Sequence, residues 1–134
     1  MNILVDTSVW SLSLRRSAPI DHPARFELEQ LVQDGRAAII GPVRQEILSG
    51  VKTTSQFDLL RNYLRTFPDI VLTAEDYEDA ARFFNRCRAK GIQGSNTDFL
   101  ICAVAARREM PILTTDVDFD RFAGALPITI HLCT

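Results

Sequence analysis

Short apolar segments alternate with longer amphipathic segments along the chain, and this alternation predicts its secondary structure. Residues 2–5 form an apolar run without polar alternation, which is typical of a buried parallel strand. Further strands are expected over residues 37–40, 70–72, 111–114 and 128–132. Strands that alternate with helices in one short chain predict an α/β fold, a three-layer α/β/α sandwich with a mostly parallel central sheet and right-handed crossovers.

The amphipathic segments predict helices whose ends are marked by proline, glycine or capping residues. The helix over 98–108 is apolar almost all round, so it is expected to be central. The helix before it opens at Thr73 and is expected to bury Tyr77, Ala80, Ala81, Phe84 and Cys87. The other expected helices begin after Asp6, run from Pro23 to Gly35 and from Gly41 to near Gly50, and cover residues 56–66 and 120–123.

The length of 134 residues is that of one domain, so a single domain over 1–134 is expected. No apolar run approaches the roughly 20 residues that a membrane helix requires, and the amino terminus lacks the pattern of a secretion signal. A cytoplasmic protein without membrane contact is therefore expected. The 15 basic and 17 acidic residues give a formal net charge of −2, which argues against binding nucleic acid through bulk positive potential alone.

Acidic residues follow the predicted strands, at the edge where open parallel sheets hold their functional sites. Asp6 closes the first strand, Glu46 lies in the helix after the second, and Asp98 opens the central helix. Asp116 and Asp118 follow a later strand. If these elements are neighbours, four or five carboxylates meet in one crevice, where a cation is needed to offset their repulsion. Oxygen ligands of this kind favour Mg²⁺ or Mn²⁺.

Such a carboxylate site is suited to the hydrolysis of phosphodiester bonds. The cation would polarise the phosphate and lower the pKa of a bound water, and a carboxylate that is not a ligand could accept the water's proton. The sequence contains no G-x-G-x-x-G, Walker A or G-x-S-x-G segment. Since His22 and His131 have no Ser or Cys partner in their sequence context, no nucleophilic constellation competes.

Four acidic segments resemble those of the PIN-domain nucleases, and specifically the VapC toxins of bacterial toxin-antitoxin pairs. They are LVDTSVW at 4–10, PVRQEILSG at 42–50, NTDFLICAVA at 96–105 and ILTTDVDF at 112–119. The DTS segment alone is a weak signal, whereas four acidic motifs at these spacings are specific. Together they span nearly the whole chain in the family's order.

The resemblance implies a PIN-like fold and a metal-dependent endoribonuclease that cleaves structured RNA, such as tRNA or ribosomal RNA. It implies that Asp6, Glu46, Asp98 and Asp116 are the catalytic, metal-binding acids, with Asp118 as a further candidate metal ligand.

Supporting residues and partners also follow from the resemblance. Thr7 or Ser8, together with Thr114, match hydroxyl positions that help to hold ligands or water. The family's toxins are usually homodimers, and a VapB antitoxin silences them by inserting a segment into the active-site groove. A VapB-like antitoxin and an RNA substrate are therefore the expected partners.

Other functions were weighed against the same acids. A magnesium-binding receiver domain would need a phosphate-pairing lysine late in the chain, but the last lysine, Lys90, precedes the third acidic segment. A phosphatase with an aspartate nucleophile would have an acid two residues after Asp6, where Ser8 stands. A catalytically inactive PIN-like interaction module is a third alternative, against which the intact acids argue. Taken singly, each acid could also be a helix cap or part of a solvated face.

Basic and aromatic residues near the expected crevice have two interpretations each. Arg15, Arg16 and Arg44 could contact RNA or could form surface ion pairs. Trp10 and Phe57 could stack on a base, although packing within the protein is the simpler interpretation.

Overall fold

A parallel three-stranded sheet with strand order β2-β1-β3 forms the centre of this computed structural model. Strand β1 (Ile3–Val5) lies between β2 (Ala37–Ala38) and β3 (Ile112–Leu113). The residues of β1 are at most 1% exposed, as expected for a strand that is covered on both faces. The structure describes residues 1–14 and 22–133.

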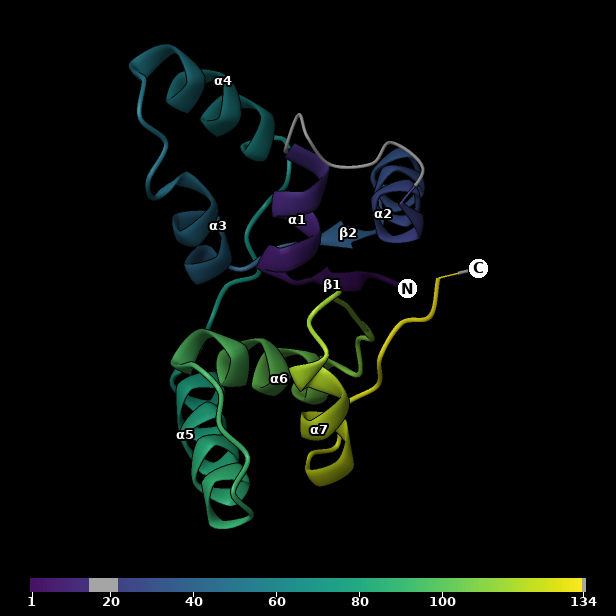
Figure 1. Cartoon of the computed structure of the whole chain (residues 1–134), viewed down its shortest axis with the longest axis vertical. Helices are drawn as coiled ribbons and strands as arrows, with labels where there is room; N and C mark the ends of the chain where they lie inside the picture. Colours follow the sequence, from purple (N-terminus) through teal and green to yellow (C-terminus); the bar gives the residue numbers. More distant parts are fainter. Residues whose placement is uncertain (15–21, 134) are drawn as a thin grey trace.

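Helices cover both faces of the sheet and make the molecule a three-layer α/β/α sandwich, which confirms the predicted fold class. Helices α1 to α4 lie on one side of the sheet and α5 to α7 on the other (Figure 1). No helix in the described part of the chain has the length and apolar run of a membrane span. The helices are α1 (Thr7–Leu14), α2 (Pro23–Gln33), α3 (Gly41–Leu48), α4 (Thr54–Leu64), α5 (Ala74–Ala89), α6 (Asn96–Arg108) and α7 (Asp118–Ala125).

The pairing of the strands brings segments near the two ends of the chain together. Ile3 pairs with Ala37, and Leu4 pairs with Ile112 on the other side. Helix α6 is the buried helix of the second layer, because residues 99–105 are all buried and α5 packs along it. The prediction of a central helix in this region is therefore confirmed.

Two of the predicted strands are wrong. Residues 70–72 follow an isolated bridge of Asp69 to Ile39 and form no strand themselves, and residues 128–132 contribute only the isolated bridge of Ile130 to Ile112. Each segment meets the edge of a short sheet at one residue and then leaves it, and outside the bridges Val71 and Leu132 are 81% and 78% exposed. Apolar runs of three to five residues indicate a strand locally, but they do not show whether a partner strand continues beside them.

Predicted helix ends differ from the observed ones by about two residues. Helix α4 covers 54–64 rather than 56–66, because the Thr53 hydroxyl accepts a hydrogen bond from the Gln56 N–H and caps it. Helix α6 begins at residue 96 rather than 98, after the cap Ser95. Helix α7 covers 118–125 rather than 120–123.

The buried face of α5 differs from the predicted one. Tyr77 is 54% exposed and Ala81 is exposed, whereas Phe84 is partly buried. The buried residues are Asp76, Ala80, Phe83 and Cys87, so Ala80 and Cys87 alone were predicted correctly. Apolar residues of α5 flank these buried residues on both sides. Because the buried face begins with an aspartate, the hydropathy of the sequence predicted the wrong face.

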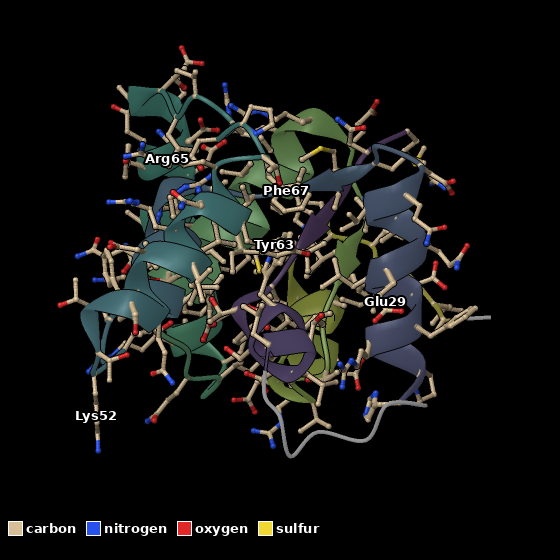
Figure 2. All side chains as sticks on the ribbon, turned by 90° about the horizontal axis from the view of Figure 1, so that it is seen from above. Glu29, Lys52, Tyr63, Arg65 and Phe67 are labelled. Carbon is tan, nitrogen blue, oxygen red and sulfur yellow. The ribbon has the colours of Figure 1, made fainter. Side chains whose placement is uncertain are left out.

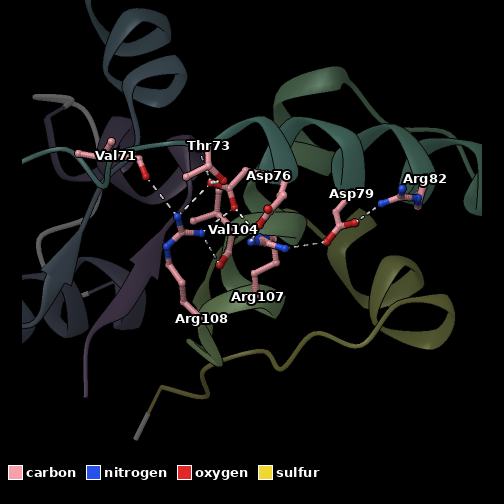
Figure 3. Close-up of polar contacts among 9 residues, drawn as sticks. Val71, Thr73, Asp76, Asp79, Arg82, Val104, Arg107 and Arg108 are labelled. Atoms are coloured by element: carbon pink, nitrogen blue, oxygen red, sulfur yellow. Dashed lines mark hydrogen bonds and ion pairs between the residues drawn. The ribbon is translucent and has the colours of Figure 1, made fainter.

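Asp76 is buried because α6 supplies its counter-charges (Figure 3). Its side chain is 0% exposed; Oδ1 accepts hydrogen bonds from Arg107 Nε at 3.0 Å and Arg108 at 2.8 Å. Oδ2 accepts from Arg108 at 3.0 Å and from the Thr73 N–H at 2.8 Å, so the same carboxylate caps α5. The Arg108 hydrogen bond, with the Thr73 N–H and both arginine charges, lowers the pKa of Asp76 far below its usual range. The start of α5 is thus tied to the end of α6.

Candidate active site

Asp6 lies at the carboxyl end of β1 and is held by two hydroxyl groups. Its main-chain N–H donates to the Leu113 carbonyl at 2.9 Å, which extends the pairing of β1 with β3. The side chain is 5% exposed, and its Oδ2 accepts hydrogen bonds from Ser8 Oγ at 2.8 Å and Thr114 Oγ1 at 2.9 Å. Burial raises the pKa of Asp6, while these hydrogen bonds counteract the rise.

The two hydroxyls also fix the loop that follows β3. Ser8 Oγ accepts from the Thr115 N–H at 3.1 Å, and Thr114 Oγ1 accepts from the Asp116 N–H at 3.0 Å. Each hydroxyl therefore donates to Asp6 and accepts from the loop that carries Asp116. Thr7, the other hydroxyl residue that the resemblance names, donates to Glu46 instead.

Glu46 is held in place by a hydrogen bond from Thr7. Thr7 Oγ1 donates to Glu46 Oε2 at 2.9 Å, which joins the first turn of α1 to α3. Because Thr7 follows Asp6 directly, this hydrogen bond places the Glu46 carboxylate next to the end of β1.

Asp98 is the third residue of α6 and is fixed by a capping box. Its Oδ2 accepts from the Ser95 N–H at 3.0 Å, while its own N–H donates to Ser95 Oγ at 3.1 Å. Burial raises the pKa of Asp98, and the negative charges of Asp6 and Asp116 raise it further. Three carboxylates from three separate elements are therefore close enough to interact electrostatically.

The last two acids cap and flank α7. Asp116 Oδ1 accepts from the Asp118 N–H at 2.9 Å, so Asp116 also has the helix-capping role that its sequence allows. Asp118 forms an ion pair with Arg121 at 3.8 Å on an exposed part of α7. The charge of Asp116 therefore acts on Asp98, whereas Asp118 pairs with Arg121.

The side chains do not form a complete metal cage as they stand. Within residues 1–14 and 22–133, no three His, Cys, Asp or Glu side chains have metal-binding spacing. The expectation of four or five carboxylates around one cation therefore stays a prediction; Thr7 donates to Glu46 and Arg121 pairs with Asp118 in this structure. The all-oxygen donors of Asp6, Asp98 and Asp116 nevertheless fit Mg²⁺, which keeps several waters and takes only one or two carboxylates.

Of the three arginines predicted as possible RNA contacts, Arg44 alone lies among the described residues, and it is already paired. Arg44 donates to Asp69 Oδ1 at 2.8 Å and to the Phe67 carbonyl at 2.7 Å, so RNA contact by Arg44 would compete with an ion pair. It stays a prediction. Arg15 and Arg16 lie outside the described residues.

Trp10 packs inside the protein. It is 0% exposed, its Nε1 donates to the Val5 carbonyl, and its ring centroid lies 5.1 Å from that of Phe67. Tyr63 also packs on Phe67, with ring centroids 5.4 Å apart, and Figure 2 shows Lys52 projecting outward. The packing interpretation of Trp10 is confirmed.

Sequence reasoning missed Ser95, the residue that orients Asp98. The spacing Ser95-x-x-Asp98 is the signature of a capping box and could have identified it. The helix predicted over 98–108 begins after this residue, so its cap was not recognised.

Comparisons with known proteins agree with this architecture. The family model described as "PIN domain" matches residues 3–125. "VapC ribonuclease Mb1587" of Mycobacterium bovis and "Ribonuclease VapC11" of Mycobacterium tuberculosis H37Rv are each 33% identical over 125 residues, covering 90% of this chain and 91% of the relative. A solved structure of VapBC2 from Rickettsia felis, bound to a promoter DNA fragment, has a TM-score of 0.77 at 19% identity and covers 98% of both chains.

The order β2-β1-β3, the acids at the strand ends and these similarities agree with one another. The chain belongs to the PIN-domain family and, within it, to the VapC-type ribonucleases.

Proposed function

We propose that this protein is the toxin of a toxin-antitoxin pair and cleaves structured RNA, such as tRNA or ribosomal RNA, with Mg²⁺ or Mn²⁺. The observation that carries the proposal is the convergence of three acids: Thr114 Oγ1 donates to Asp6 Oδ2 and accepts from the Asp116 N–H, and the charges of Asp6 and Asp116 add to the burial that raises the pKa of Asp98. Three buried or half-buried carboxylates on separate elements repel one another, so a cation between them stabilises the arrangement. Asp118 is a candidate further ligand from the rim of the site.

The chain's own residues have distinct roles in this proposal. Asp6, Asp98 and Asp116 would hold the ion, and the hydroxyls of Ser8 and Thr114 orient Asp6. A bound Mg²⁺ or Mn²⁺ would supply Lewis-acid activation of the phosphate and of a water molecule.

Glu46 is the carboxylate best placed to act as a base. The Thr7 hydroxyl occupies Glu46 Oε2, which leaves Oε1 to accept a proton from the attacking water. Thr7 is therefore a positioning residue for Glu46, whereas Ser8 and Thr114 position Asp6.

RNA cleavage by the purified protein tests this assignment. We expect cleavage with Mg²⁺ or Mn²⁺, and loss of cleavage with EDTA, Asp6→Asn or Asp98→Asn. Asp120→Asn is the matched control, because Asp120 is an exposed acid on α7 and should be dispensable. Full cleavage by Asp6→Asn would contradict the site, and inactivity of the wild type with all RNAs would favour an inactive interaction module.

The toxin role and the partners need separate tests. The Rickettsia neighbour is a VapBC complex, and the mycobacterial relatives are VapC proteins, which supports a VapB-like antitoxin as the partner. Induction in bacteria should arrest growth, while the soluble Asp6→Asn variant should not. Co-expression of an antitoxin encoded beside the toxin gene should restore growth. Light scattering of the purified chain tests the proposed homodimer, and fractionation tests its proposed cytoplasmic location.

A further inference from the structure

Gly94 has no room for a side chain. A Cβ at this position would lie 2.6 Å from Phe122 Cζ and 3.0 Å from two ring carbons of Phe99. The φ angle of Gly94 is not in the left-handed region, so glycine is required here for space. By contrast, a Cβ at Gly124 on α7 would have no heavy atom within 4 Å.

The rings that crowd Gly94 cannot easily move aside. Phe122 is 0% exposed and packs between Phe99 and Phe119, with centroid distances of 5.0 Å and 5.1 Å. Phe99 is 1% exposed and also packs against Phe84 at 5.5 Å. This aromatic cluster, Phe84, Phe99, Phe119 and Phe122, joins α5, α6 and α7, so a ring that gives way to an added methyl group disturbs the rings packed against it.

The main chain after Gly94 leads directly to a site acid. Ser95 follows Gly94, and its N–H donates to Asp98 Oδ2 at 3.0 Å. Phe99, one of the crowding rings, follows Asp98 in the sequence. The contact of Gly94 with the aromatic cluster therefore sets the position of the N–H that orients the Asp98 carboxylate.

We propose that Gly94 is a positioning residue for cation binding: its close packing on Phe99 and Phe122 places the Ser95 N–H so that Asp98 Oδ2 is held and Oδ1 faces the cation. The proposal rests on the proposed function, since it assigns Asp98 to the metal. An added side chain would move the loop away from the rings, carry the Ser95 N–H with it and turn the carboxylate. Partners that orient metal ligands typically change metal affinity by about 10- to 100-fold when they are altered.

Binding of Mn²⁺ to the purified, metal-free protein, measured by calorimetry and by the electron paramagnetic resonance signal of free Mn²⁺, tests this inference. We expect Gly94→Ala to raise the Kd for Mn²⁺ by about tenfold or more. Gly124→Ala should bind as the wild type does. Thr53→Ala removes the hydroxyl cap of α4, which contributes no residue to the proposed site, so it should lower the Tm while changing the Kd less than about threefold. This variant separates the position of the Ser95 N–H from a general loss of stability.

Phe122→Leu removes the closest contact of an added Cβ at Gly94, the one at 2.6 Å, and leaves only the contacts of 3.0 Å with Phe99. In this background, adding Gly94→Ala should change the Kd less than about threefold, and the comparison remains possible if Gly94→Ala alone does not fold. A wild-type Kd for Gly94→Ala, an equal loss of affinity in Thr53→Ala, or a full loss that persists in the Phe122→Leu background would overturn the inference. If the wild type itself binds no Mn²⁺, or Asp6→Asn and Asp98→Asn bind it normally, the proposed metal site fails instead.

Discussion

Replacing Asp76 by Asn should destabilise the fold without touching the chemistry. The variant keeps one oxygen, which can still accept from the Thr73 N–H, but its amide group then faces the arginine donors where Oδ1 stood. Counting only the lost charge-assisted hydrogen bond to Arg108, whose side chain is 28% exposed, the cost is about 2–3 kcal/mol. For a chain of this length, that loss lowers the Tm by about 6–12 °C.

Circular dichroism during heating measures this change, and the control is Asp79→Asn. Asp79 belongs to the same network, but its side chain is 26% exposed and its contact with Arg107 is 3.4 Å long. Its replacement should lower the Tm by less than about 3 °C. A Tm within about 2 °C of the wild type for Asp76→Asn at pH 7 would refute the reasoning.

The pH dependence gives an independent check. Because the Arg108 hydrogen bond lowers the pKa of Asp76 in the folded state, its contribution is present above the ordinary carboxyl pKa of about 4 and is lost as pH falls below it. The Tm difference between the wild type and Asp76→Asn should therefore narrow in acid. A Tm difference between the two proteins that stays constant down to pH 2 would show that the effect comes from the shape of the Asp76 side chain rather than from its charge.

Three further predictions concern the site. Burial and acidic neighbours raise the pKa of Asp98, so the destabilisation of the folded state by its negative charge grows as pH rises. Metal-free Asp98→Asn should therefore have a higher Tm than the wild type at pH 7 and the same Tm in acid. A lower Tm of Asp98→Asn at pH 7 would contradict this. Thr7→Val should lower kcat for RNA cleavage by about tenfold with little change in Tm, because it releases Glu46; an unchanged kcat would remove Thr7 from the mechanism. Arg44→Ala should lower the Tm through its lost pair with Asp69 and leave the salt dependence of RNA binding unchanged, whereas a shallower dependence would support RNA contact.

The local pattern was enough to predict most of the elements. The apolar run ending at Asp6, the glycines and prolines at helix ends, and the apolar segment after Asp98 each depend on neighbours within a few residues. The predictions of strands at the edges of the sheet were wrong, because whether residues 70–72 extend a sheet depends on a partner strand elsewhere in the chain. The buried face of α5 failed for a similar reason, since Asp76 is buried by arginines 31 and 32 residues away.

The sequence named the acids that the proposed site uses, but it did not predict their contacts. Strand order and the rule for parallel sheets bring Asp6, Asp98 and Asp116 to one edge. The sequence does not show that Thr7 holds Glu46 from 39 residues away, or that hydroxyls rather than arginines surround Asp6. These contacts depend on side-chain reach across packed elements, which spacing along the chain does not encode.

The pairing of β1 with β3 also determines when the protein becomes active during its synthesis. Thr114 donates to Asp6 across 108 residues, so a nascent chain carries Asp6 long before it carries the hydroxyl that orients it. Parallel pairing over such a separation forms late in folding, because the entropy of closing the intervening chain must first be lost. A ribosome-bound or prematurely terminated chain therefore lacks the hydroxyl that orients Asp6, and under the proposed function translation must pass β3 before the cleavage site can assemble.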